Sequence, residues 1–85
     1  MIPPVDRDTI DRLREHLRKL RARHGLTQEK VAQLAGLDYK FYQSIEAGRR
    51  AELRVSTVER IAKAYGLAAY QLLAPKMPAT GKRGR

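Results

Sequence analysis

The chain has 85 residues, with 18 Lys and Arg against 9 Asp and Glu, and a formal net charge of +9. This length allows one small domain, and the excess of positive charge indicates a polyanionic partner. The sequence has no cysteine, no apolar run near the ~18 to 20 residues of a membrane span and no signal-peptide pattern, which excludes disulfides and thiolate metal sites and predicts a soluble, cytoplasmic protein.

Residues 1–5 are predicted to form a flexible arm, because two prolines hinder the start of a helix. A helix is predicted from about Asp6 or Asp8 to His24, with an apolar stripe at helical spacing: Ile10, Leu13, Leu17 and Leu20. His16 and His24 have no second imidazole or thiolate at ligand spacing, so we expect packing or solvated roles for them. We expect neither a metal nor a cofactor.

The stretch TQEKVAQLAGLDYKFYQSIEAG, residues 27–48, predicts two short helices joined by a tight turn. Thr27 is a good N-cap for the first helix, and Gly36 can take the left-handed conformation that ends it. Asp38 can then cap a second helix that starts at Tyr39.

This second helix is predicted to bury Tyr42 and Ile45 on one side. The opposite side carries small and polar residues at helical spacing: Lys40, Gln43, Ser44 and Ala47. Lys, Gln and Ser are residue types that reach base edges in DNA. The same pattern also fits a helix face that is simply solvated. The turn that precedes this helix favours contact with DNA bases instead.

After residue 48 the sequence predicts a basic loop in which Leu53 or Val55 anchors the chain to the core. For Arg54, a solvated position and a contact with DNA are equally good interpretations. Ser56 and Glu59 have the spacing of a capping box for a fourth helix. Its predicted apolar stripe is Val58, Ile61, Ala62 and Tyr65.

A short last helix with a poor cap is predicted for residues 68–73, followed by a disordered basic tail at residues 75–85. The last helix is more apolar than its own burial requires. We therefore expect a dimer interface or a partner site there, formed by Leu67, Tyr70 and Leu73.

The stretch that begins at residue 27 and ends in the IEAGRR sequence resembles the helix-turn-helix of the Cro/repressor (Xre-like) family of bacterial and phage transcriptional regulators. The resemblance rests on the opening T-Q, the V-A pair, the turn glycine and the I-E-x-G-[KR] close. It implies an all-α, five-helix, lambda-repressor-like bundle at residues 6–74. It further implies a cytoplasmic homodimer that binds double-stranded DNA, as a repressor does, with the third helix in the major groove of a pseudo-palindromic operator.

The resemblance and the residue types together predict the site. The expected base-reading residues are Tyr39, Lys40, Gln43 and Ser44. The expected phosphate-binding residues are Gln28, Arg49, Arg50 and Arg54. Tyr39 could touch phosphate, contact a thymine methyl group or pack on Gln28. The family pattern also implies a structural ion pair between Arg21 and Glu46.

Two other interpretations remain at this point. The domain could be an antitoxin or another protein-interaction module, with a partner such as a toxin bound at the apolar last helix. Charge alone could also serve RNA or general polyanion binding, although the chain offers few aromatic stacking platforms. No arrangement of residues resembles a catalytic site, so an enzyme is not expected.

Overall fold

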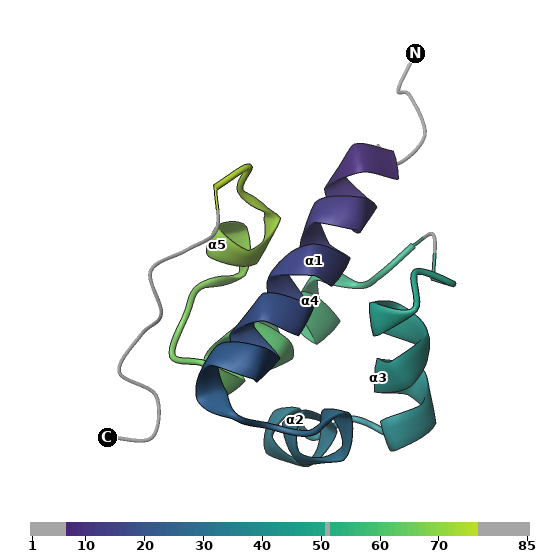
Figure 1. The fold of residues 1–85 in the computed structure, drawn as a ribbon. Helices are drawn as coiled ribbons and strands as arrows, with labels where there is room; N and C mark the ends of the chain where they lie inside the picture. The colour runs from purple at the N-terminus through teal and green to yellow at the C-terminus, as the bar shows by residue number, and fades with distance from the viewer. Residues whose placement is uncertain (1–6, 51, 77–85) are drawn as a thin grey trace.

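The computed structural model describes residues 7–50 and 52–76. These residues form five α-helices, α1 Arg7–His24, α2 Gln28–Ala35, α3 Tyr39–Glu46, α4 Val55–Ala64 and α5 Ala69–Leu73 (Figure 1). The prediction of an all-α, five-helix bundle is confirmed. The predicted arm at residues 1–5 lies outside the described residues, as does the predicted tail apart from Pro75 and Lys76. Within the described part of the chain, no helix is both long and apolar enough to cross a bilayer.

The long helix α1 crosses in front of α4, with α3 on one side of it and α5 on the other (Figure 1). It contacts both α3 and α5, while α2 contacts α3 and α4, and α4 also contacts α5. The apolar stripes predicted for the first and fourth helices are buried at the centre of these contacts. All five helices contribute to the core, which contains Leu13, Leu17, Leu20, Val31, Ala32, Ala35, Tyr42, Ile45, Val58, Ile61, Ala62, Tyr65 and Leu72.

The turn between α2 and α3 forms as predicted. The Thr27 hydroxyl accepts a hydrogen bond from the Lys30 N–H at 3.0 Å, which caps α2. Gly36 ends α2 with φ of 71°, a left-handed conformation that glycine adopts without a steric penalty. The Asp38 carboxylate then accepts a hydrogen bond from the Phe41 N–H at 3.1 Å and starts α3. The angle between the two helices is thus set by the turn at residues 36–38, which lies between two capped helix ends.

The predicted capping box of Ser56 and Glu59 is wrong. The helix α4 begins at Val55, so that Ser56 already lies in its first turn, and its N-cap is Arg54, whose side chain makes no capping hydrogen bond. Arg54 is the N-cap residue and has an extended backbone conformation. It takes this position because Leu53, the residue before it, anchors the loop to the core. That residue is partly buried against the core, whereas Val55 is 70% exposed.

A buried histidine of α1, His16, forms a hydrogen bond to the backbone of the short helix α5. His16 is 5% exposed, and its Nδ1 atom lies 2.9 Å from the backbone oxygen of Leu72. The N-cap of α5 is Ala68, which has no capping side chain, but its N–H donates to Gln71 Oε1 at 2.9 Å. The expected packing role of His16 is therefore confirmed. The described residues contain no group of three or more potential metal ligands.

Candidate nucleic-acid interface

The outer face of α3 carries three of the predicted base-reading residues. Tyr39 is 41% exposed, Lys40 is exposed and Gln43 is partly exposed. The other side of the helix is fixed in the core, because Tyr42 is fully buried and Ile45 is 2% exposed. The chain therefore presents Tyr39, Lys40 and Gln43 to solvent on a helix that cannot rotate without unpacking the core.

A chain of hydrogen bonds connects this outer face to the interior. Gln43 Nε2 lies 3.2 Å from the Tyr39 hydroxyl and 3.5 Å from Gln28 Oε1. Gln28, predicted to bind phosphate, donates its own Nε2–H to Glu46 Oε1 at 3.0 Å. The amide nitrogen of Gln43 is thus hydrogen-bonded both to Gln28 of α2 and to Tyr39 of its own helix.

Glu46 lies at the inner end of this chain and is 3% exposed. Arg21 of α1 donates to both of its carboxylate oxygens, from Nε to Oε2 at 2.7 Å and from Nη2 to Oε1 at 3.0 Å. The Tyr42 hydroxyl donates to Oε2 at 2.5 Å. The ion pair that the family resemblance implied is therefore present in bidentate form, and Glu46 also provides the partner that the buried Tyr42 hydroxyl requires.

The electrostatics of this cluster favour an ionised Glu46. Burial by itself would raise the pKa of Glu46, but hydrogen bonds from Arg21, Tyr42 and Gln28 outweigh it and hold that pKa below its ordinary value. Burial, followed by the hydrogen bond to Glu46, raises the pKa of Tyr42 above its ordinary value. The ionised Glu46 carboxylate on α3 therefore binds side chains from α1, α2 and α3 together.

The segment after α3 brings two of the predicted phosphate-binding residues to the surface. Arg49 and Arg50 are both exposed. Arg50 Nε donates to Ser44 Oγ at 3.0 Å, and its Cζ atom lies 4.8 Å from the centre of the Phe41 ring. Ser44, predicted to read bases, is only 8% exposed and lies beneath this arginine. Arg54, the fourth predicted phosphate ligand, is exposed at the start of α4.

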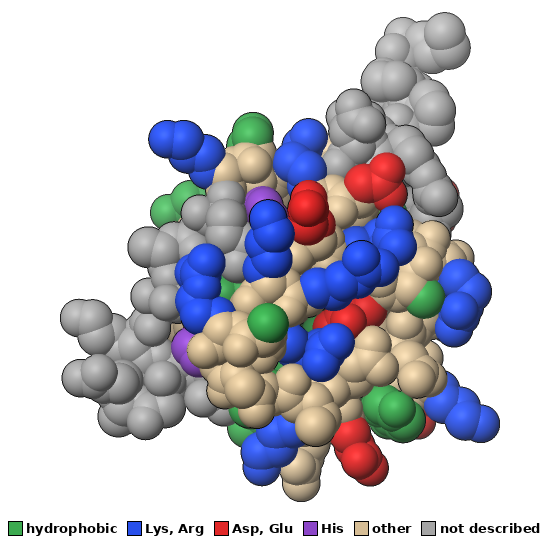
Figure 2. Space-filling model, viewed as in Figure 1, with side chains coloured by type: hydrophobic (Ala, Val, Ile, Leu, Met, Phe, Trp, Pro, Cys, Tyr) green, Lys and Arg blue, Asp and Glu red, His purple; other side chains and the backbone are tan. Residues whose placement is uncertain are grey.

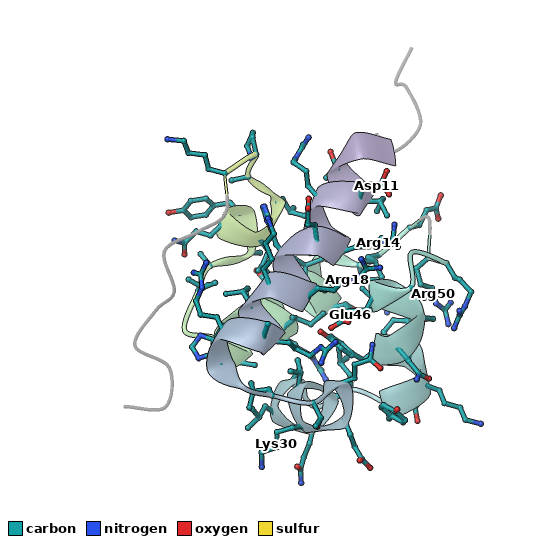
Figure 3. All side chains as sticks on the ribbon, in the orientation of Figure 1. Asp11, Arg14, Arg18, Lys30, Glu46 and Arg50 are labelled. Carbon is teal, nitrogen blue, oxygen red and sulfur yellow. The ribbon has the colours of Figure 1, made fainter. Side chains whose placement is uncertain are left out.

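Basic side chains extend from this segment over α1. Lys and Arg side chains are spread across the face shown in Figure 2, and Figure 3 places Arg14, Arg18 and Arg50 on it. Arg14 Nε donates to the backbone oxygen of Glu46 at 3.2 Å and so braces the end of α3. This role was not predicted from the sequence, although Arg14, Arg18 and Arg21 recur at helical spacing along α1.

The predicted dimer interface lies at α5. Leu67 and Leu73 are partly buried against the core, whereas Tyr70 is 74% exposed. An apolar groove of about 160 Å³ adjoins α5, with Leu73 and the exposed Val55 in its lining. Apolar surface therefore remains uncovered at this end of the protein.

A capped two-helix turn within a five-helix bundle defines the helix-turn-helix class. Residues 12–73 match the family model described as a helix-turn-helix domain, and the chain belongs to that family. It is 36% identical over 72 residues to the "Neisseria hypothetical transcription factor" of Neisseria meningitidis serogroup B, a match that covers 85% of this chain and 67% of that protein.

A solved structure supports the same assignment. The crystal structure of the hypothetical transcription factor NHTF from Neisseria has a TM-score of 0.74 and 33% sequence identity to this chain. The superposition covers 88% of this chain and 86% of the other. The likeness therefore extends over nearly the whole bundle and includes sequence as well as fold.

Proposed function

We propose that this protein is a transcriptional regulator that binds a specific sequence of double-stranded DNA. The observation that carries this proposal is the outward-facing set of Tyr39, Lys40 and Gln43 on a helix held by the Glu46 cluster. In a helix-turn-helix domain the second helix of the motif enters the major groove, where Lys contacts guanine and Gln contacts adenine. The relative from Neisseria meningitidis and the solved structure from Neisseria both carry the name of a hypothetical transcription factor, which supports the same class.

The phosphate contacts in this proposal come from Arg49, Arg50 and Arg54 and from the start of α2. Arg49 and Arg50 follow α3 directly and are exposed. The start of α2 adds a helix N-terminus, whose dipole favours anions. The formal net charge of +9 provides the long-range attraction.

Selection of bound sequences from a random duplex pool, at near-physiological salt, tests this function directly. Lys40→Ala and Gln43→Ala should each cost roughly 1 to 3 kcal/mol on the selected site and leave nonspecific binding nearly unchanged. Arg49→Ala provides the contrasting control, since loss of a phosphate contact should weaken both kinds of binding together. If Lys40→Ala and Gln43→Ala bind the same sequence with unchanged affinity, α3 is not the reading helix.

We further propose that the regulator binds as a two-fold symmetric dimer through Leu67, Tyr70 and Leu73. A single module of this size makes too few base contacts to select one site in a genome. Tyr70 on α5 is 74% exposed, and Leu73 lines an apolar groove between α1, α4 and α5. Such a dimer would place the half-site centres about 10 to 11 base pairs apart, one turn of DNA.

Leu73→Glu should therefore weaken self-association and full-site binding while the monomer stays folded. Sedimentation measures the first effect and footprinting the second, with circular dichroism to confirm folding. A wild-type protein that sediments as a monomer at micromolar concentration and protects a lone half-site would rule out the dimer. In that case the exposed Tyr70 would favour the alternative of a protein partner, such as a toxin, at α5.

A further inference from the structure

Arg50 is an exposed side chain whose guanidinium is nevertheless held in place. Its Nε–H donates to Ser44 Oγ at 3.0 Å, and its Cζ atom lies 4.8 Å from the centre of the Phe41 ring, within the range of a cation–π contact. Its two Nη groups make no hydrogen bond to another described residue. The Nε side of the guanidinium is therefore fixed by α3, while its two Nη groups carry donors that no described residue uses.

Ser44 is poorly placed to read a base. Its hydroxyl proton is donated to the backbone oxygen of Phe41 at 2.6 Å, and its oxygen accepts the hydrogen bond from Arg50. The residue is 8% exposed. A short side chain whose donor is already used, and which is covered by a neighbouring arginine, offers little to the edge of a base pair.

The backbone after α3 determines that Arg50 returns to this position. Gly48 has φ of 77°, and its left-handed turn reverses the chain at the end of the helix. The next N–H, of Arg49, donates to the backbone oxygen of Ser44 at 3.0 Å. Ser44, Phe41 and Arg50 therefore move with α3 as one unit, so that the position of the guanidinium is coupled to that of the reading helix.

We propose that Ser44 and Phe41 are positioning residues that aim the free Nη edge of Arg50 at a phosphate of the DNA backbone beside α3. This inference rests on the proposed DNA-binding function. A guanidinium presents a planar pair of donors that matches a phosphate, and fixing its side chain before binding removes part of the ordering cost. The contact between Arg50 and the phosphate would then set the register of α3 in the groove, because Ser44 and Phe41 of α3 position Arg50.

A double-mutant cycle on the selected duplex tests this inference. Arg50→Ala should reduce affinity about tenfold or more, and Ser44→Ala about threefold, with no change in the preferred base at any position. In the Arg50→Ala background, Ser44→Ala should have almost no further effect, because the group it positions is gone. Phe41→Leu, which keeps an apolar side chain without the ring, should behave as Ser44→Ala does.

Arg49→Ala serves as the matched control, since Arg49 is the adjacent exposed arginine and has no side-chain hydrogen bond to Ser44. Ser44→Ala should keep its full threefold effect in that background. Melting temperatures of all variants separate a loss of folding from a loss of binding. The salt dependence adds a second measurement: Arg50→Ala should lower the slope by about 0.9 per contact.

Two results would overturn the inference while leaving the proposed function intact. One is a Ser44→Ala variant that changes the preferred base at a single position with an effect independent of Arg50, which would make Ser44 a base reader. The other is an Arg50→Ala variant that binds the selected site as tightly as the wild type. Failure of the wild-type protein to select any duplex sequence would instead contradict the proposed function itself.

Discussion

Glu46→Ala should lower the free energy of unfolding by about 3 to 5 kcal/mol, a large stability effect for a single change. The carboxylate is 3% exposed and accepts four hydrogen bonds, two of them from Arg21. Its removal leaves the Tyr42 hydroxyl buried without a partner and Arg21 without its counter-charge. Because the Arg21 side chain is 25% exposed and can regain some hydration, the lower end of the range is the better expectation.

Thermal or urea unfolding measures this effect, and Glu15→Ala is a matched control. Glu15 pairs with Lys19 at 3.7 Å, but both side chains are more than half exposed, at 64% and 58%. An exposed pair of this kind contributes about 0.2 to 1 kcal/mol at most. A Glu46→Ala protein with the stability of Glu15→Ala, but with altered DNA binding, would show that Glu46 acts at the interface and does not support the fold.

The same cluster predicts how stability depends on pH. The pKa of Glu46 is lower in the folded protein than its ordinary value, which applies to the unfolded chain. The stabilisation is therefore complete above the ordinary pKa of a glutamate, about 4.3, and is lost as the pH falls below that value toward the folded pKa. Glu46→Gln should remove this part of the acid sensitivity, and an unchanged acid profile in that variant would contradict the assignment.

Local patterns were sufficient to predict most of the fold. The end of α1 at His24, both ends of α2, the left-handed Gly36 and the Asp38 cap each depend on residues within one turn of one another, so the sequence contains the whole signal. Ser56 and Glu59 show the limit of this reasoning. They have the right local spacing, but the path of the loop and the burial of Leu53 start α4 earlier.

The arrangement of the site depended on contacts that local patterns do not contain. Gln28 lies 15 residues before Gln43, yet the two side chains meet because the turn sets α2 against α3. The placement of Arg50 on Phe41 follows from the chain reversal at Gly48. An alternating or helical pattern identifies which face of α3 is polar, but it does not show that Ser44 is covered by an arginine from the following segment.

DNA affinity should fall steeply with salt, because most of the attraction in this proposal comes from exposed basic residues around α3. If a dimer neutralises about six to eight phosphates, log affinity should fall against log salt with a slope near −5 to −7, at roughly 0.9 per contact. Between 50 and 200 mM salt, affinity would then drop by about 10³- to 10⁴-fold. This is the largest change expected in any binding measurement on the protein.

The slope of log affinity against log salt, measured for single variants, shows which surface of the protein contacts the phosphates. Arg50→Ala should reduce it by about 1.8 per dimer, which is two contacts at 0.9 each. Lys63→Ala changes the charge equally but lies on α4, behind α1 in Figure 1, and should leave the slope nearly unchanged. Leu73→Glu should roughly halve the slope if two copies share one operator. If Lys63→Ala and Arg50→Ala lower the slope equally, net charge governs binding and Arg50 makes no phosphate contact beyond that of its charge.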